Sequence, residues 1–359
     1  MRRILVIFGG CSTEYEVSLQ SAAAVAEAID VSRYEVLYLG ISREGEAYYY
    51  TGDAEGIRNG SWQKQALPAT VSMSRGEPVL WIEDGRQLRK VYFDMAFPVM
   101  HGKNGEDGTL QGLCEMADIP VVGCGMESSC IGMDKQLAHT LAKLAGVRVP
   151  ESVVLQSPVE YAQKQEGIQA LGLPVRAGSS FGITRVVKKE DMEQAVKEAF
   201  RHDGEVLIEE EISGFEVGCA VMGNEELTLG RVDEIELQKS EGDSFFDYEE
   251  KYTLKTSVIH MPARISAEEE ARIREAAVKI YRALHCRDFT RVDLFYTDKK
   301  EIVFNEVNTI PGFTSHSRFP NMMKGIGSDF AQTVNGIIGA TEKRTEDVKD
   351  AAKHGQHNG

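Results

Sequence analysis

Residues 289–296 and 301–308 each alternate polar positions with β-branched or aromatic ones, and a short polar segment, residues 297–300, lies between them. Alternation of this kind predicts two antiparallel strands joined by a hairpin turn. If the four-residue segment sets the register, Asp293 lies opposite Phe304, and the next polar residue of the second strand is its diagonal neighbour. A two-stranded hairpin is therefore expected near the C-terminal end of the chain.

One face of this hairpin is expected to be polar, because successive side chains of a strand point to opposite faces. Its members are Arg291, Asp293, Glu306 and Asn308. Two carboxylates and an amide oxygen are the hard ligands that Mg²⁺ takes, and substrate phosphates usually complete its coordination. The neighbouring guanidinium would stabilise an anion. The alternative interpretation is a solvated polar face, which antiparallel sheets commonly have.

A loop with a proline, a glycine and several hydroxyl groups follows the hairpin directly, at residues 309–317. Proline and glycine end the strand, so backbone N–H groups and hydroxyls come next to the expected metal site. Binding sites are commonly built on such strand ends and loops.

The N-terminal stretch begins with an apolar run, residues 4–8, which ends at a pair of glycines and leads into a helical pattern over residues 16–26. Strand, glycine turn and helix are the usual start of an α/β domain that binds its ligand at the carboxyl end of the strand. Thr13 and Glu16 fit a capping box, which gives Glu16 a structural interpretation beside a binding one. Neither a G-x-G-x-x-G fingerprint nor a G-x-x-x-x-G-K-[ST] loop is present in this stretch, so a dinucleotide cofactor is disfavoured.

Three further loops are candidates for binding. Residues 101–109 form a polar glycine loop, in which His101 is either a ligand contact or a turn histidine satisfied by the backbone. Residues 173–182 combine glycines and hydroxyls that suit phosphate oxygens, and the long polar loop 238–254 suits a lid. The last residues, 341–359, have almost no large apolar side chain and are expected to form a frayed tail.

Composition narrows the function more than the fold. The 359 residues are 42% hydrophobic and 27% charged, which suits two or three domains with their own cores. The net charge of −16 argues against a nucleic-acid partner, which needs a basic surface, and no apolar run approaches a membrane span. The six cysteines show no C-x-x-C pair, so reduced, buried thiols in a cytoplasmic protein are expected.

Five motifs, in fixed order, carry a resemblance to a known family. They are F-G-G-x-S-x-E-x-E-V-S, H-G-x-x-G-E-D-G-T-L-Q-G, M-D-K, G-S-S-x-G and N-E-x-N-T-x-P-G-F-T-S-H-S. Over residues 1–340 the chain resembles the D-alanine-D-alanine ligase family of the ATP-grasp superfamily. Further stretches, such as F-F-D-Y-E-E-K-Y-T-L-K, are similar to its vancomycin-resistance branch of VanG-type D-alanine-D-serine ligases.

The resemblance implies an α/β protein with the ATP-grasp fold and an N-terminal Rossmann-like (pre-ATP-grasp) domain. The N-terminal substrate domain would span residues 1–132, the central ATP-grasp domain 133–212, and the C-terminal ATP-grasp domain with the metal site 213–340, followed by a disordered tail at 341–359. It also implies a cytoplasmic homodimer that uses ATP, two Mg²⁺ ions (or Mn²⁺), D-alanine and D-serine, with no nucleic acid and no membrane.

The implied reaction converts the first D-alanine to an acyl phosphate, which the amine of the second amino acid attacks. By resemblance, the catalytic residues are Glu16, Ser179, Lys251, Tyr252, Arg291 and Gly312, with Arg291 and the Gly312 N–H at the oxyanion. The nucleotide contacts would be Lys135, Ser180, Phe181, Glu209, Glu210, Ile212, Glu216 and Asn305. The amino-acid contacts would be Ser18, His101, Ser317 and Arg318. The metal ligands would be Asp293, Glu306 and Asn308.

One departure from the family pattern concerns the central domain. The family has a strand ending in Lys-Pro before the G-S-S-x-G loop, and that lysine binds ATP phosphates. Here about five residues are missing between Val175 and Arg176, which would remove most of a strand and weaken ATP binding. The alternatives to a D-alanine-D-serine ligase are therefore an ordinary D-alanine-D-alanine ligase and an inactive relative.

The second substrate depends on two positions. Tyr252 in the expected lid resembles the ligases whose acceptor is an amine rather than D-lactate. Ser317-Arg318 replaces the Ser-Leu of many D-alanine-D-alanine ligases, and its polarity would favour the hydroxyl of D-serine directly or by reshaping the pocket. The alternative is that Arg318 is a surface residue, because arginine is seldom buried.

Overall fold

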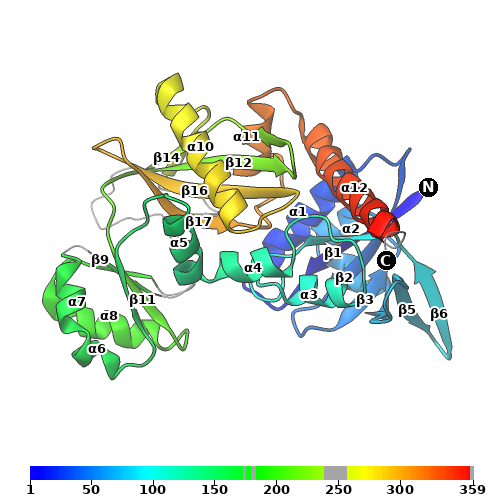
Figure 1. Cartoon of the computed structure of the whole chain (residues 1–359). Coiled ribbons are helices and arrows are strands. Elements are labelled where there is room, and N and C mark those ends of the chain that lie inside the picture. The colour runs from blue at the N-terminus through cyan, green and yellow to red at the C-terminus, as the bar shows by residue number, and fades with distance from the viewer. Residues whose placement is uncertain (173–174, 179–182, 238–256, 356–359) are drawn as a thin grey trace.

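The computed structural model describes residues 1–172, 175–178, 183–237 and 257–355. Three sheets follow one another along the chain (Figure 1). The fold is of the mixed α/β type that the sequence predicts. In the described residues no helix is both long and apolar enough to cross a membrane.

The N-terminal sheet has seven strands in the order β6-β5-β4-β3-β2-β1-β7. β1 pairs in parallel with β2 and β7, whereas β3 to β6 extend the sheet in antiparallel fashion. The buried apolar run of β1 is what a strand covered on both faces requires. The strands are β1 Arg2–Gly9, β2 Tyr34–Ile41, β3 Ala47–Tyr50, β4 Ala66–Val71, β5 Val79–Asp84, β6 Gln87–Tyr92 and β7 Met95–Val99. The helices are α1 Tyr15–Ala28, α2 Ala54–Arg58, η1 Ser61–Gln65, α3 Thr109–Met116 and α4 Met126–Met133.

The central part forms a four-stranded sheet in the order β10-β9-β11-β8. Its strands are β8 Ser152–Leu155, β9 Val175–Gly178, β10 Thr184–Val186 and β11 Val206–Glu210. Its helices are α6 Glu160–Gln163, α7 Gln165–Ala170, η2 Lys189–Asp191 and α8 Met192–Ala199, and α5 Lys135–Leu144 precedes them. The apolar face of α8 closes a small core against this sheet.

The prediction that the short junction removes most of a central strand is wrong. β9 starts at Val175 and continues through the residues after the junction, and it pairs with both β10 and β11. Arg176 stands opposite Glu209 in that register. Ladder hydrogen bonds use only the backbone, so the residues that follow the gap can form the strand.

The C-terminal sheet runs β15-β14-β12-β16-β17, with β13 paired to β12. Its strands are β12 Gly214–Gly223, β13 Leu227–Leu229, β14 Asp233–Leu237, β15 Ser257–His260, β16 Phe289–Thr297 and β17 Ile302–Asn308. Its helices are α10 Ala267–Ala283, α11 Arg318–Lys324 and α12 Phe330–Gly355. Ser266 and Glu269 form a reciprocal capping box at the start of α10.

The predicted hairpin exists, but its register differs from the prediction. Asp293 pairs with Glu306 rather than with Phe304, and a bulge follows between Asp293 and Leu294. Two effects shift the pairing by one residue each: the turn, where Lys300 has a φ of 63°, and the bulge. A one-residue shift alone would move the polar residues of the second strand to the other face. The two shifts together amount to two residues, so the four polar residues still share one face and that part of the prediction is confirmed.

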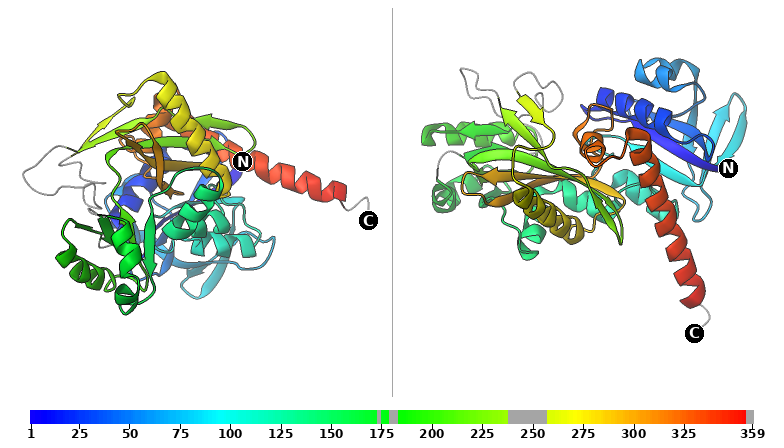
Figure 2. Two further views of the ribbon diagram at one scale, coloured as in Figure 1. Left: turned by 60° about the vertical axis from the view of Figure 1, so that its left-hand side comes forward. Right: turned by 90° about the horizontal axis from the view of Figure 1, so that it is seen from above.

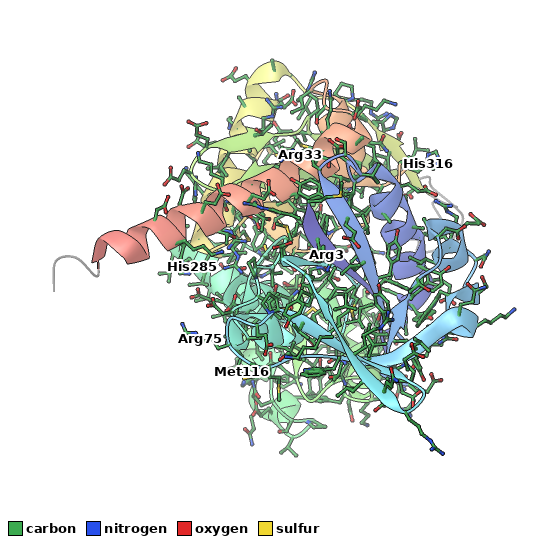
Figure 3. All side chains as sticks on the ribbon, turned by 90° about the vertical axis from the view of Figure 1, so that its right-hand side faces the viewer. Arg3, Arg33, Arg75, Met116, His285 and His316 are labelled. Atoms are coloured by element: carbon green, nitrogen blue, oxygen red, sulfur yellow. The ribbon has the colours of Figure 1, made fainter. Side chains whose placement is uncertain are left out.

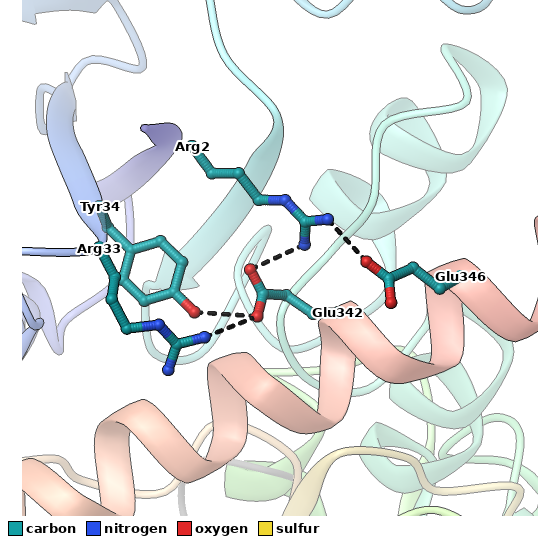
Figure 4. A pocket seen from close by; sticks show the side chains of 5 residues that line it. All are labelled: Arg2, Arg33, Tyr34, Glu342 and Glu346. Atoms are coloured by element: carbon teal, nitrogen blue, oxygen red, sulfur yellow. Dashed lines mark hydrogen bonds and ion pairs between the residues drawn. The ribbon is translucent and has the colours of Figure 1, made fainter.

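The expectation of a frayed tail from residue 341 is also wrong, because α12 continues through Gly355. Figure 2 shows this long helix, coloured red, leaving the body of the molecule towards the C-terminus. Its polar side chains, rather than apolar ones, hold the first part of this extension. Glu342 accepts from Arg2 at 2.8 Å, from Tyr34 at 2.9 Å and from Arg33 at 3.2 Å (Figure 4).

A second polar joint lies deeper, at the buried carboxylate of Asp288. It accepts hydrogen bonds from Gly123, Asn224 and Thr341 and forms an ion pair with Arg344, all at 2.8–3.1 Å. These contacts join the end of the N-terminal part, the C-terminal sheet and α12. The side-chain view from the N-terminal part shows Arg33 beside α12 (Figure 3).

Candidate active site

The polar face of the β16–β17 hairpin forms the centre of the site. Arg291 stands opposite Asn308, and Asp293 stands opposite Glu306. Arg291 makes a bidentate contact with Asp293, in which Nε donates to Oδ1 at 2.8 Å and Nη2 donates to Oδ2 at 2.6 Å. Asn308 Nδ2 also donates to Asp293 Oδ2, at 2.9 Å. Cross-strand neighbours on one face lie close enough to share a ligand.

The buried guanidinium of Arg318 adjoins this face from the start of α11. Nε and Nη2 donate to the two oxygens of Asp233 at 2.8 Å, and Nη1 donates to Glu216 at 2.8 Å. Nη1 also lies 3.4 Å from Asp293 Oδ1. Burial opposes the charge, but Asp233 and Asp293 outweigh it and raise the pKa of Arg318 well above its ordinary value.

Arg318 is therefore not a surface arginine, and that alternative is wrong. Its donors point at carboxylates, and Gly218 leaves room for it, since a Cβ there would meet Nη2 at 2.4 Å. Glu216, one of the predicted nucleotide contacts, is likewise engaged with this guanidinium.

Charge and donor type decide whether this face fits a divalent cation. Four carboxylates (Asp233, Asp293, Glu216 and Glu306) face two guanidinium groups, so the formal charge is negative. Within the described residues, no three His, Cys, Asp or Glu side chains are gathered tightly enough to bind a metal by themselves. Two carboxylates and an amide oxygen nevertheless fit Mg²⁺, which binds through a few protein oxygens and substrate phosphates.

The loop after β17 is anchored to the N-terminal part. His101 Nδ1 donates to the Ile310 carbonyl at 2.9 Å, which leaves Nε2 to accept from Ser21 at 3.2 Å. The Phe313 N–H donates to the same Ser21 hydroxyl at 3.2 Å, and Glu106 accepts from Ile310 N at 3.2 Å. His101 is 2% exposed, so it supports the loop from the buried side.

Ser317 and Gly312 lie in this loop as predicted. Ser317 Oγ accepts from the Thr314 N–H at 3.0 Å and contacts the Thr314 hydroxyl at 2.9 Å. A Cβ on Gly312 would come within 3.1 Å of Ser317 Oγ. The serine thus shapes the turn that precedes α11.

The two predicted residues on α1 have different surroundings. Glu16 lies in the first turn, where its exposed carboxylate pairs with Arg43. The helix begins at Tyr15 without a side-chain cap, so the capping box predicted for Thr13 and Glu16 is wrong. Ser18 is fully buried, accepts from the Gly9 N–H and donates to the Val99 carbonyl. It joins β1, β7 and α1.

Three of the predicted nucleotide contacts, Lys135, Glu209 and Ile212, lie between α5, β11 and the β16–β17 hairpin. Lys135 Nζ donates to Glu209 Oε2 at 2.7 Å, and Ile212 is buried against Phe295 and Val303. Glu210 instead pairs with Arg148 at 3.4 Å.

Sequence reasoning missed one residue of this cluster, His139, whose Nε2 donates to the Asn305 carbonyl at 2.8 Å. Its position four residues after Lys135, on the same helix face, was the available signal.

The remaining predicted residues, Ser179, Ser180, Phe181, Lys251 and Tyr252, lie outside the described residues. The lid prediction for residues 238–254 lies there as well.

Two family models match the chain. The D-ala D-ala ligase N-terminus model matches residues 3–124, and the D-ala D-ala ligase C-terminus model matches residues 141–339. The chain belongs to the D-alanine-D-alanine ligase family, whose members are ATP-dependent ligases.

Relatives named for different functions are similar to nearly the whole chain. The vancomycin B-type resistance protein VanB of Enterococcus faecalis is 40% identical, with 94% of this chain and 97% of VanB covered. A D-alanine-D-alanine ligase of Caldicellulosiruptor bescii is 37% identical, with 96% of both chains covered. The crystal structure of the VanG D-Ala:D-Ser ligase from Enterococcus faecalis superposes with a TM-score of 0.86 at 54% identity, covering 95% of this chain and 99% of that one.

Proposed function

We propose that this enzyme joins D-alanine to D-serine at the expense of ATP and so makes the modified dipeptide of vancomycin-resistant cell walls. The observation that carries the proposal is the polar face of β16 and β17, where Asp293 pairs with Glu306 and Arg291 with Asn308 beside the loop at 309–317. The 54% identity to a solved D-Ala:D-Ser ligase supports D-serine as the acceptor.

In this proposal the hairpin face has two tasks. Asp293, Glu306 and Asn308 would hold Mg²⁺, and a bound Mg²⁺ would supply positive charge against the phosphate oxygens. The guanidinium of Arg291 lies 2.6–3.1 Å from the carboxylate oxygens of Asp293. It would donate, with the Gly312 N–H, to the oxyanion of the tetrahedral intermediate, where one lost donor typically costs about 100- to 1000-fold in rate.

The other side chains bind and orient the substrates. Glu16, exposed on α1, would exchange Arg43 for the ammonium of the first D-alanine, and Lys135 would exchange Glu209 for nucleotide phosphates. Ser317 would face the carboxylate of the acceptor. Arg318, which is occupied by three carboxylates, would favour D-serine by shaping the pocket and not by touching the hydroxyl.

A second candidate function is ordinary D-alanine-D-alanine ligation. It is favoured by the 37% identity over nearly the full length to a ligase of that name. An inactive relative is less well supported, because β9 forms despite the short junction and the hairpin face is complete.

Phosphate release from ATP tests whether the chain is an active ligase. With Mg²⁺, D-alanine and D-serine together, we expect steady release that stops when either Mg²⁺ or the amino acids are left out. A folded protein that binds both amino acids but releases no phosphate would refute catalysis and favour the inactive relative.

A further inference from the structure

Two buried acceptor atoms face each other between α5 and β11. His139 Nδ1 lies 3.4 Å from Glu209 Oε1, and neither atom has a hydrogen-bond partner. The two side chains are only 5% and 9% exposed. Buried polar groups nearly always have a partner, so this contact calls for a donor.

The tautomer of His139 follows from its other nitrogen. Nε2 lies 2.8 Å from the backbone carbonyl of Asn305, and a carbonyl can only accept, so Nε2 carries the hydrogen. In the neutral ring Nδ1 then carries a lone pair instead of a hydrogen, and this lone pair faces Oε1 of Glu209. The edge of the ring packs against Phe304, with ring centroids 5.4 Å apart, which fixes this orientation.

Lys135 explains why the contact persists in this state. Its ammonium lies 2.7 Å from the other oxygen of Glu209. Lys135 and His139 are on the same helix, α5. The charged groups that act on the imidazole are Lys135 from α5, Glu209 from β11 and Glu306 from β17. Burial, together with Lys135, lowers the pKa of His139 although both carboxylates oppose this, so the ring is neutral near pH 7.

We propose that His139 is a positioning residue that takes up a proton from solvent and replaces Lys135 as the partner of Glu209 when a nucleotide binds. The inference rests on the proposed function, in which the nucleotide phosphates draw Lys135 away. Departure of the ammonium removes its repulsion and leaves Glu209 uncompensated in a buried place. A hydrogen on Nδ1 then satisfies both orphaned atoms at once, and Glu209 stays in position.

Calorimetry of Mg²⁺-ADP binding, in two buffers with different heats of ionisation, counts the protons taken up. Near pH 7 we expect the wild type to take up about half a proton or more per nucleotide beyond the His139→Gln variant. His285→Gln is the matched control, because His285 is an exposed histidine on the turn after α10 that pairs with Glu127, and it should behave as the wild type. Equal proton uptake in the wild type and His139→Gln would overturn the inference. That result is expected if the adenine amino group, and not a proton on Nδ1, supplies the missing hydrogen.

A second measurement mimics the departure of Lys135 without nucleotide. Nitrogen-15 spectra of the full chain report whether both ring nitrogens of His139 are protonated, and the signal is assigned by its loss in His139→Gln. In Lys135→Met at pH 7 we expect the doubly protonated ring, and in the wild type the neutral one. A neutral ring in Lys135→Met would contradict the exchange.

The two failures can be told apart. If Mg²⁺-ADP gives no binding heat, the nucleotide site and the inference built on it are both wrong. If it binds and His139 does not change its protonation, only the inference is wrong.

Discussion

Replacing Arg318 by methionine should cause a large loss of stability, because this guanidinium is buried among carboxylates. The guanidinium is 6% exposed and lies 2.8 Å from both Asp233 and Glu216 and 3.4 Å from Asp293. Without it, Asp233 keeps the Gly218 N–H at 2.9 Å but has lost its cation at a fully buried position. Breaking a buried ion pair from one side costs about 3–5 kcal/mol, because the remaining charge stays buried.

Urea unfolding at pH 7 measures this loss. We expect the free energy of unfolding to fall by about 3–5 kcal/mol for Arg318→Met, and by a smaller amount for Arg318→Lys, which keeps the charge but not the two-pronged contact. Adding Asp233→Asn to Arg318→Met should recover part of the loss, because both charges are then gone. Arg75→Met, at an 85% exposed side chain, is the surface control and should change stability by less than about 0.5 kcal/mol.

A stabilising role for Arg318 would be refuted if Arg318→Met lowered the free energy of unfolding no more than the Arg75→Met control. It would also be refuted if the double variant were less stable than Arg318→Met, since the carboxylate would then not be the group that suffers. Either result would mean that the contacts around Arg318 do not bear on the folding of the C-terminal part.

Three further predictions concern the metal, the junction and α12. Glu306→Gln should abolish Mg²⁺-dependent phosphate release while the circular dichroism spectrum stays unchanged, because it removes a metal-binding charge; turnover at the wild-type level would contradict the metal assignment. Inserting a Lys-Pro-containing segment between Val175 and Arg176 should tighten ATP binding about tenfold or more, since a charge-assisted phosphate contact contributes about 1.5–3 kcal/mol; equal affinities by calorimetry would show that another group, such as Lys188, already serves. Burial and the Glu342 hydrogen bond raise the pKa of Tyr34 from 10.0 to about 12, so its contribution to stability is complete below pH 10 and is lost as the pH rises towards 12. Tyr34→Phe should therefore lose less stability than the wild type between pH 10 and 12 in thermal unfolding, and parallel curves would remove Tyr34 from this linkage.

The sequence predicted the polar face of the hairpin correctly and its register incorrectly, and the reason is local. Alternation fixes which residues share a face within each strand. Asp293 and Glu306 stay on one face because the two one-residue shifts add up to two residues. A bulge adds a residue on one strand and has no signal of its own in a short alternating segment. The face, and with it the metal hypothesis, could thus be predicted before the pairing.

Polar contacts over long sequence distances were the part that the pattern could not give. The extension of α12 past residue 341 depends on Glu342 and Arg344 meeting Arg2, Arg33 and Asp288. Arg318 became a buried residue for the same reason, because Asp233 and Glu216 lie far away in the chain. Hydrophobic periodicity reports burial of apolar faces and is silent on such ion pairs.

Product analysis in a competition tests the central proposal most directly. The protein is given Mg²⁺, ATP, D-alanine and equal concentrations of D-serine and D-lactate at neutral pH, and the products are separated by mass. We expect mostly D-alanyl-D-serine. Mostly D-alanyl-D-alanine would favour the ordinary ligase instead, and mostly D-alanyl-D-lactate would contradict the proposal that the acceptor is an amine.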